Sequence, residues 1–264
     1  MTMINCSVGK GIMSREDCLG CALKGENTCG YDYAVLRWLI NDEEKEKRQN
    51  EIHVTDVTGC LRRAWYDKCD PTPEGPHENL ARALGSVVHK ALEGDDDFLM
   101  SEMPIKRGEL QGTADIVYKN GTILDFKTTR WLSPEKLPYG SHELQVNIYA
   151  WMLRGMGQPT NELKIQYVDM SGPTKCRKCR VPVREVLGEI VCPKCLNAPK
   201  GAHLGALTVD VPVMSDDHVE NIISPRIKTL IQSIADLTPP DPEPSWLCEY
   251  CAHREKCNPT FTEE

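Results

Sequence analysis

The chain has 264 residues, with 31 Lys and Arg against 39 Asp and Glu, a formal net charge of -8 and 13 cysteines. This length allows one well-packed core with small additions and excludes a miniature disulfide-held scaffold. The acidic balance excludes a protein that coats nucleic acid by bulk charge, so any contact with phosphate groups has to be local. No segment offers the ~18 uncharged apolar residues of a membrane span, and the first residues lack the apolar stretch of a signal peptide. We therefore expect a soluble, cytoplasmic protein without a membrane partner.

In chain order, the first predicted elements are helices. Segment 31–48 has an apolar half and a charged end, which indicates a partly exposed helix. A second helix is expected to begin near Cys60 and to end before Asp70. The proline-rich segment 71–76 separates it from a third helix over about 78–92.

The apolar period changes after these helices. Alternation of apolar and polar residues predicts strands over 98–106, 112–119 and 122–129. An Asn-Gly pair at 120–121 separates the last two strands and is the strongest short-range signal of a hairpin turn. We therefore expect these two strands to pair antiparallel.

The second half of the chain alternates helices and strands around a cysteine-rich insertion. We expect Ser141 to cap the first of these helices, and we expect the proline-rich segment 237–245 to be a stiff linker that delivers the last cysteines to a remote part of the fold. The predicted elements are a helix over 141–155, strands over 163–170 and 206–213, and a helix over 216–236.

Three residues of the predicted hairpin carry the most informative chemistry. Asp125 and Lys127 are two positions apart and point to the same face of a strand, and Asp115 on the neighbouring strand can lie opposite them. Carboxylate oxygens, water and substrate phosphate are the ligands that Mg2+ or Mn2+ prefers, and a lysine beside them can orient an attacking water. Taken alone, however, this triplet also fits a solvated strand end.

Two neighbouring helices strengthen the interpretation of a site. His89 precedes the strands in GSVVHKALEG, and Gln145 and Tyr149 place two polar groups one turn apart on the helix that follows. Each has an ordinary alternative, since a single histidine in an apolar helix is commonly a satisfied core residue.

The ordered set GSVVH, GTAD, DFK and QVNIY resembles the RecB-like group of the PD-(D/E)XK nucleases. TGCLRRAWY and WLCEYCAHREKC add one cysteine and then three, and this arrangement is similar to that of the iron-sulphur members. Those members include the AddB nuclease domain and the Cas four family of CRISPR-associated exonucleases. The resemblance covers residues 53–170 and 204–258.

The resemblance implies a metal-dependent DNA exonuclease, a hydrolase acting on single-stranded DNA ends. It also implies a place in CRISPR adaptation with an integrase complex as partner, while a recombination or repair nuclease of the same fold stays open. A catalytically silent DNA-binding module and a redox protein are the rival classes. The implied residues are His89, Asp115, Asp125 and the Phe126 carbonyl as ligands of Mg2+ or Mn2+, Lys127 as the catalytic lysine, and Gln145 and Tyr149 as positioning groups.

The cysteines form groups, and in a reducing interior CxxC pairs are typical of metal ligands rather than disulfides. The resemblance implies a [4Fe-4S] cluster on one group, for which zinc is the alternative. The groups are Cys60, Cys248, Cys251 and Cys257 for that cluster; Cys176, Cys179, Cys192 and Cys195; Cys6, Cys18, Cys21 and Cys29; and the remaining Cys69.

The second group has the spacing CxxC-x12-CxxC, which predicts a zinc ribbon. Across 174–203 there are seven Lys and Arg and two acidic residues, a local charge of +5 that falls to +3 with Zn2+ and four thiolates. Two roles stay open, namely stapling of an inserted loop and contact with nucleic acid or a partner.

The N-terminal group contains a single CxxC, and the resemblance does not extend to it. Zinc is the favoured ion for this group, while free cysteines or a second iron-sulphur cluster remain alternatives. We expect Cys69 to be a small, partly buried residue.

The predicted fold is a mixed α/β, restriction-endonuclease-like core with an Fe-S cluster and an inserted zinc ribbon. The expected organisation is an N-terminal cysteine module with a helix over 1–52, a nuclease domain over 53–264, and the ribbon over 171–203 within it.

Overall fold

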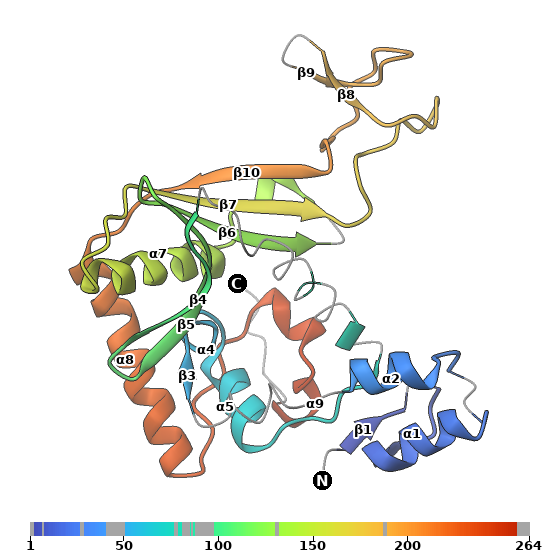
Figure 1. Ribbon diagram of the computed structural model, residues 1–264, viewed down its shortest axis with the longest axis vertical. Helices are drawn as coiled ribbons and strands as arrows, with labels where there is room; N and C mark the ends of the chain where they lie inside the picture. Colours follow the sequence, from blue (N-terminus) through green and yellow to red (C-terminus); the bar gives the residue numbers. More distant parts are fainter. Residues whose placement is uncertain are drawn as a thin grey trace. The chain divides into compact units, whose positions relative to one another are not determined.

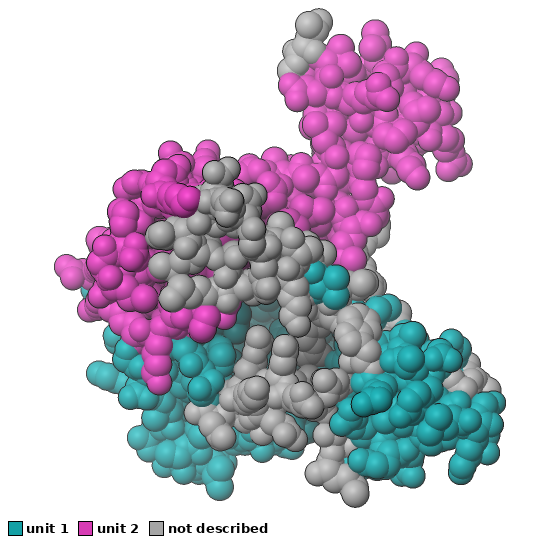
Figure 2. All heavy atoms as spheres, viewed as in Figure 1, with its two compact units in different colours: residues 1–88, 108–111, 221–264 teal, residues 89–107, 112–220 magenta. Residues whose placement is uncertain are grey.

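The computed structural model (Figure 1) describes residues 3–6, 8–26, 29–40, 51–76, 79–80, 85, 87, 98–129, 132–186 and 189–257. The backbone forms two compact units that are discontinuous in sequence (Figure 2). One comprises residues 1–88, 108–111 and 221–264, and the other comprises residues 89–107 and 112–220. Most of the helix predicted over 78–92, including His89, lies outside the described residues, as do residues 41–48 of the first predicted helix.

The second unit is built on a mixed sheet. β5 pairs antiparallel with β6, β6 pairs parallel with β7, and β7 pairs antiparallel with β10, while β4 also pairs with β5. The predicted strands are confirmed. Their bounds are Phe98–Arg107 for β4, Leu110–Tyr118 for β5, Thr122–Thr129 for β6, Glu162–Asp169 for β7 and Ala206–Val211 for β10.

The turn between β5 and β6 follows the predicted Asn-Gly chemistry. Gly121 has φ +86°, and a Cβ at this position would lie 3.0 Å from the Pro159 carbonyl oxygen. The Asn120 side chain accepts the Thr122 N–H at 3.0 Å. The hairpin therefore requires a glycine both for its backbone conformation and for this close approach.

Helix α7 (Gly140–Gly155) connects β6 to β7 and packs on β4, β6 and β7. Parallel strands need such a crossover connection. The helix begins one residue earlier than predicted, with Tyr139 as its N-cap and no side-chain capping bond. The prediction that Ser141 caps it was wrong, because Ser141 lies inside the first turn.

The C-terminal half of α7 is fixed by a cation at the end of β4. The Arg107 guanidinium lies 3.8 Å from the centre of the Trp151 ring, and it donates to the Trp151 carbonyl at 2.6 Å and to the Glu220 carboxylate at 3.1 Å. Stacking of this kind holds the helix against the sheet by contacts that an apolar side chain could not make.

The cysteine-rich insertion leaves the sheet after β7 and returns at β10. Backbone bonds from Asp169 N–H to the Gly205 carbonyl at 2.8 Å and from Thr174 N–H to the His203 carbonyl at 3.0 Å close its base. Its own strands are β8 (Arg184–Val186) and β9 (Glu189–Val191), which pair antiparallel.

The first unit joins segments from both halves of the chain. The Trp65 indole N–H donates to the Ser233 carbonyl at 2.9 Å, which holds α5 against α8. The prediction of these two helices is confirmed, and β3 pairs parallel with the first residues of β5. The elements are β3 (Ile52–His53), α4 (Val54–Thr58), α5 (Leu61–Cys69), most of α8 (the whole helix is Asp216–Ala235), the 3-10 helix η2 (Trp246–Tyr250) and α9 (Arg254–Cys257). A further 3-10 helix, η1 (Pro134–Lys136), lies in the other unit.

The N-terminal part of this unit is a hairpin followed by two helices. Its buried cluster consists of Ile4, Cys18, Leu36, Leu39 and Ile40. The hairpin and the first helix were not predicted from the sequence. The elements are β1 (Met3–Asn5), β2 (Ile12–Ser14), α1 (Arg15–Leu23) and α2 (Tyr33–Leu39).

Among the described residues, no helix has the length and apolar character needed to cross a membrane.

Candidate active site and metal sites

Three predicted site residues meet on the paired strands β5 and β6. The register pairs Val117 with Ile123 and Ile116 with Leu124. Because side chains alternate along a strand, Asp125 and Lys127 project to the same face of β6, and Asp115 contacts the residue between them. The structure therefore brings two carboxylates and an ammonium together on these paired strands.

Asp115 is held in place by the neighbouring strand. Its Oδ2 accepts the backbone N–H of Phe126 at 2.6 Å. This side-chain bond lies just beyond the last backbone pair of the two strands. The residue is 8% exposed. A bond from a backbone N–H orients a buried carboxylate without a flexible partner, which is what a ligand oxygen requires.

Asp125 is paired with Lys127. The Lys127 Nζ lies 2.8 Å from the Asp125 Oδ2, and the side chains are 21% and 1% exposed, respectively. One ammonium offsets only one of the two buried negative charges, so the set retains an excess of negative charge. Two oxygen donors with this excess suit a hard divalent cation, and Mg2+ or Mn2+ fits the residues present.

Gln145 and Tyr149 lie on one face of α7. The Gln145 Nε2 donates to the Tyr149 hydroxyl at 3.0 Å, and both residues are buried. This bond fixes the orientation of both polar groups. His89 lies outside the described residues, and the metal-binding role of the Phe126 carbonyl stays a prediction.

A second pair in this unit was missed by the sequence interpretation. The His142 Nδ1 lies 3.0 Å from the Tyr167 hydroxyl, with His142 in the first turn of α7 and Tyr167 on β7. Burial and then the positive charge of Lys127 lower the pKa of His142 to about 4. Burial and the charge of Asp125 raise the pKa of Tyr167 to about 12, although a bond with the Tyr139 backbone opposes this. The first turn of α7 therefore lies within electrostatic reach of the β6 charges.

The missed histidine did leave a signal in the sequence. His142, Gln145 and Tyr149 are spaced i, i+3 and i+7, which places them on one face of a helix. Extending the Gln-Tyr pattern by one turn toward the N-terminus would have found it.

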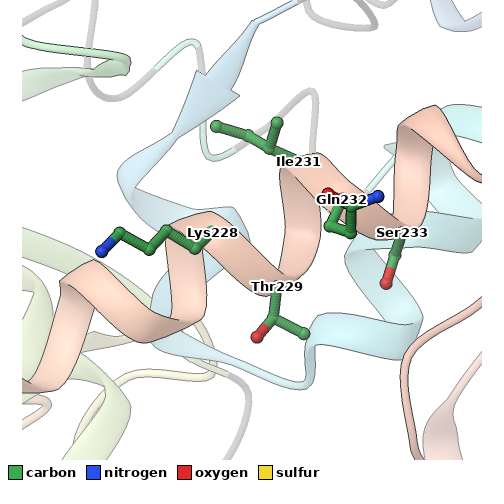
Figure 3. Close-up of a pocket in the computed structure, with 5 residues that line it drawn as sticks. All are labelled: Lys228, Thr229, Ile231, Gln232 and Ser233. Atoms are coloured by element: carbon green, nitrogen blue, oxygen red, sulfur yellow. The ribbon is translucent and has the colours of Figure 1, made fainter.

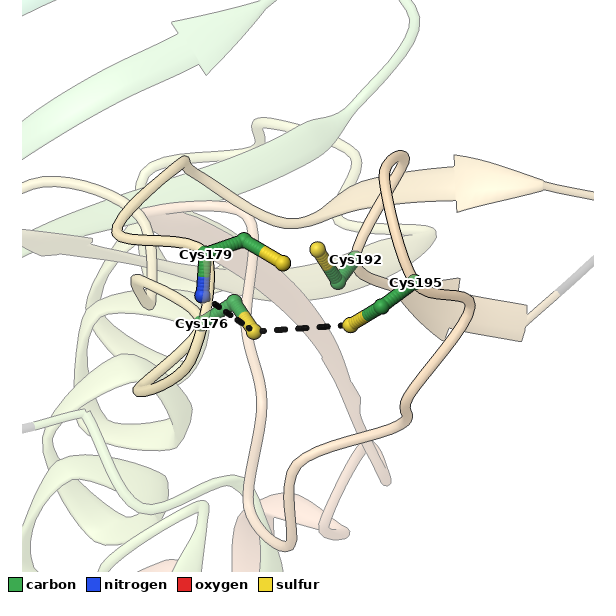
Figure 4. A group of neighbouring side chains, drawn as sticks. All are labelled: Cys176, Cys179, Cys192 and Cys195. Carbon is green, nitrogen blue, oxygen red and sulfur yellow. Dashed lines mark hydrogen bonds between the residues drawn. The ribbon is translucent and has the colours of Figure 1, made fainter.

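The four ribbon cysteines converge (Figure 4). Their sulfurs all lie within 4.8 Å of one another, and the Cys176 and Cys195 sulfurs are 3.8 Å apart. A Zn–S bond of ~2.3 Å gives sulfur separations of ~3.8 Å in a regular tetrahedron. This geometry fits a single tetrahedral ion such as Zn2+. Among the described residues this is the one group found with ligand atoms so close.

The two CxxC pairs have the same backbone turn. The Arg180 N–H donates to the Cys176 carbonyl and the Leu196 N–H donates to the Cys192 carbonyl, both at 2.8 Å. Arg180 and Leu196 directly follow the second cysteine of each pair and have φ of 58° and 55°. A bulky residue with positive φ is strained, so the repeated strain indicates that the turn is selected for the sulfur geometry.

The ribbon thiols also show opposed ionisation. A hydrogen bond with the Cys195 side chain, followed by burial, raises the pKa of Cys179 to about 12. Burial opposes ionisation of Cys192, but the backbone N–H groups of Lys194 and Cys195 donate to its sulfur and lower its pKa to about 7. Crowded thiols of this kind lose their protons together only when a cation joins them.

The structure brings together the segments that carry the predicted iron-sulphur ligands. Cys60 is the N-cap of α5, Cys248 lies in η2, Cys251 follows η2, and Cys257 ends α9. The Arg62 guanidinium donates to the Cys257 sulfur at 4.0 Å. A cubane cluster holds its four thiolates on different iron atoms, farther apart than those around one zinc ion.

Side chains of α5 fasten the C-terminal segment. The Arg62 Nε donates to the Pro240 carbonyl at 2.6 Å, and the His253 ring bridges Asp67 at 2.7 Å and Thr72 at 2.8 Å. His253 also stacks on Tyr66, with ring centres 5.2 Å apart. These contacts explain how segments far apart in sequence reach one region of this unit.

The N-terminal cysteines come from three segments. Cys6 follows β1, Cys18 and Cys21 lie on α1, and Cys29 precedes α2.

A hollow of about 620 Å3 lies along α8 (Figure 3). Among the described residues it is lined by one amine, two hydroxyls, an amide and an aliphatic side chain. These residues include no carboxylate or thiol, so they provide no acid-base pair and no metal ligand set. Its residues are Lys228, Thr229, Ile231, Gln232 and Ser233.

Comparison with known proteins agrees with this geometry. The family model of the PD-(D/E)XK nuclease superfamily matches residues 96–258, more than half of the chain. The CRISPR-associated exonuclease Cas4 of Saccharolobus solfataricus is 27% identical over 129 residues, which cover 40% of this chain and 59% of that protein. The chain thus spans less than two thirds of the length of this relative.

One solved structure shows a similar fold. The crystal structure of SSO0001 superposes with a TM-score of 0.50 at 17% identity, covering 95% of this chain and 98% of that chain. A phage-related exonuclease from Haemophilus somnus 129PT matches with a TM-score of 0.35 at 12% identity, covering 74% of this chain and 100% of that chain.

Proposed function

Because the chain belongs to the PD-(D/E)XK nuclease superfamily, we propose that it is a divalent-metal-dependent deoxyribonuclease that acts on single-stranded DNA ends. The observation that carries this proposal is the set of Asp115, Asp125 and Lys127 on the paired strands β5 and β6. A DNA-binding protein without catalysis needs no pair of buried carboxylates, because phosphate groups are repelled by them.

The chain's own residues divide the chemistry between them. Asp115 and Asp125 would hold the Mg2+ or Mn2+ ion, with His89 and the Phe126 carbonyl as further ligands. When bound, the ion supplies positive charge to the scissile phosphate and to the leaving oxygen. Lys127 holds the attacking water by a hydrogen bond.

Helix α7 supplies the positioning groups. The Gln145 amide and the Tyr149 hydroxyl are preoriented by their mutual bond of 3.0 Å, and they hold the DNA strand or the groups that contact it. Preorientation matters because a misplacement of about 1 Å can cost roughly a hundredfold in rate.

Two further metals are part of the proposal. Cys60, Cys248, Cys251 and Cys257 hold a [4Fe-4S] cluster that fastens the C-terminal segment to α5. The ribbon cysteines hold Zn2+, as their tetrahedral separations favour. An anaerobic preparation with absorption near ~400 nm and about four iron atoms per chain would support the cluster, and a colourless preparation with zinc in its place would refute it.

The basic ribbon supplies a second contact with DNA. Arg177, Lys178, Arg180 and Lys194 are exposed, and no ion pair joins any of them to another residue in the described part of the chain. In an acidic chain, unpaired cations gathered on one small lobe favour a phosphate contact over a purely structural loop.

The pathway we propose is CRISPR adaptation, with an integrase complex as partner. Its support is the matching segment of the Cas4 exonuclease. A recombination or repair nuclease of the same fold is the alternative. Spacer acquisition is measured in cells that carry the integrase together with either the wild-type chain or Lys127→Ala. An adaptation nuclease should give different acquisition in the two strains, whereas a recombination nuclease should give the same.

The decisive experiment is a Mn2+ time course on single-stranded DNA labelled at either end. We expect progressive shortening from one end by the wild-type chain and none by Lys127→Ala. Lys106→Ala, which removes an exposed lysine from β4, is the matched control and should cleave normally. Intact labelled ends with the wild-type chain, together with retained DNA binding, would identify a silent binding module instead.

A further inference from the structure

The N-terminal segment has little apolar material to hold it together. Among the described residues its cluster contains five buried ones, one of which is Cys18. Small cores of this size are commonly supplemented by a metal or a disulfide. In this segment the candidates for such a supplement are Cys6, Cys18, Cys21 and Cys29.

The first candidate ligand, Cys6, lies in a turn that shares one backbone bond with the ribbon turns. The Cys6 N–H donates to the carbonyl of the residue five positions later, Gly11, at 3.0 Å. In the ribbon, Cys176 donates to Val181 and Cys192 donates to Asn197 with the same spacing, both at 2.9 Å. Cys6 therefore makes the same backbone bond as the first cysteine of each ribbon turn, although its turn closes one residue earlier, at Gly9.

A glycine stands where the ribbon turn has its second cysteine. Gly9 is three residues after Cys6, has φ +77°, and donates to the Cys6 carbonyl at 3.0 Å. This turn can provide only one sulfur, so the other ligands of an ion held there have to come from other segments.

Helix α1 offers the next two. Cys18 and Cys21 are three residues apart and so lie on one face of the helix. The helix start is fixed by the Ser14 Oγ, which accepts the Asp17 N–H at 3.0 Å. The cap determines where the helix begins and therefore which face Cys18 turns toward the core.

The fourth sulfur comes from the loop before α2. Cys29 packs against the same buried cluster that contains Cys18. Cys18 and Cys29 therefore share one buried cluster, although they belong to separate segments.

We propose that Cys6, Cys18, Cys21 and Cys29 form a second structural zinc site, separate from the ribbon and from the nuclease chemistry. Four thiolates without an oxygen donor suit a tetrahedral, closed zinc site. On binding, the four thiols release their protons to solvent, which leaves two negative charges in excess on the complex. The Lys10 ammonium donates to the Cys21 sulfur at 3.6 Å and offsets part of this charge.

In the described part of the chain, the ribbon cysteines are the one group found with its ligand atoms within 4.8 Å of one another. The four N-terminal sulfurs therefore have to move closer together to surround an ion. The Cys6 turn is exposed at Val8, Gly9 and Lys10, so it can close without disturbing buried contacts.

Zinc and iron content of the purified full chain tests the proposal. We expect two zinc ions per chain in the wild type and one in the double variant Cys6→Ser, Cys29→Ser, with iron unchanged. Cys69→Ser is the matched control and should keep both zinc ions. Unchanged zinc in the double variant, or a loss of iron instead of zinc, would overturn the assignment.

Thiol labelling provides a measurement that does not depend on a variant folding. In the wild-type chain, N-ethylmaleimide should label Cys6, Cys21 and Cys29 slowly before chelation and rapidly after a chelator removes zinc, as read by peptide mass spectrometry. Rapid labelling of these three cysteines before chelation would show that no metal protects them. Neither measurement uses DNA, so failure of this site and failure of the nuclease proposal are distinguishable.

Discussion

The Lys127 ammonium lies 2.8 Å from the carboxylate of Asp125, two residues earlier on β6, and Asp125 is 1% exposed. Removing the lysine leaves a buried carboxylate without this cation, which costs roughly 2–4 kcal/mol. We therefore expect Lys127→Ala to lower the melting temperature in a chelator by roughly 5–10 °C. Added Mn2+ should raise it more in the variant than in the wild type, since the ion replaces the missing positive charge. Calorimetry that finds equal melting temperatures in the chelator would contradict this role of Lys127.

Asp115 contributes both a negative charge and a hydrogen bond, and two variants separate these contributions. Asp115→Asn keeps an oxygen that accepts the Phe126 N–H, whereas Asp115→Ala leaves that N–H unsatisfied at a cost of roughly 1–3 kcal/mol. We expect both variants to lose cleavage, but only Asp115→Ala to lose stability in urea denaturation. Cleavage by Asp115→Asn at the wild-type rate would show that the carboxylate charge is not needed.

His142 should make the free energy of unfolding depend on pH. Its pKa is about 4 in the folded chain, below the ordinary value of 6.5, because burial and Lys127 oppose its protonation. Above pH 6.5 the ring is neutral in both states and its contribution is fully present. As the pH falls toward 4, the unfolded chain takes up a proton that the folded chain does not, so stability is lost.

The comparison with His142→Asn isolates this contribution, because the other titrating groups are common to both chains. Between pH 7 and pH 5 the wild type should lose roughly 2 kcal/mol more than the variant. Urea denaturation in the presence of a chelator measures the difference. Parallel pH curves for the two chains would mean that His142 is accessible to protons in the folded state.

Glu243 and Arg226 should control iron retention without binding iron. The Glu243 carboxylate accepts the Leu61 N–H at 3.2 Å, next to Cys60, and pairs with Arg226 at 2.9 Å. The Arg226 guanidinium also donates to the Val57 carbonyl at 2.7 Å and to the Gly59 carbonyl.

We expect Glu243→Ala to lose iron to a chelator roughly ten times faster than the wild type, because a supporting residue orients the ligand segment. Absorbance decay of the anaerobic protein follows the loss. Asp217→Asn, an exposed carboxylate on α8, is the control and should decay at the wild-type rate. Identical decay in the wild type and both variants would show that the Glu243–Arg226 pair does not affect iron retention.

The ribbon cations should appear in the salt dependence of DNA binding. Replacing Arg177, Lys178 and Lys194 by Gln removes three exposed charges but none of the ribbon sulfurs. For single-stranded DNA this should reduce the slope of log affinity against log salt by roughly 2. Binding measured between low and moderate salt gives the slope, and Lys228→Gln serves as a control. An unchanged slope with zinc still bound would leave the ribbon a purely structural role.

Local sequence patterns determined much of this protein. Alternation and the Asn120-Gly121 turn predicted β5 and β6, and two-residue spacing put Asp125 and Lys127 on one face, because these features depend on neighbouring residues alone. The CxxC pairs likewise predicted the ribbon. The N-terminal hairpin was missed because its strands of three residues are too short to show a period. The helix α1 that follows it was also missed.

Only the tertiary structure decided which distant residues meet. The bond from the Phe126 N–H to Asp115 depends on strand register, and the pairing of His142 with Tyr167 depends on how α7 lies on β7. Cys18 and Cys29 come from a helix and a loop, and no pattern in the sequence shows that they pack in one cluster. These relationships arise from packing between segments, where burial and backbone geometry, rather than local spacing, set the distances.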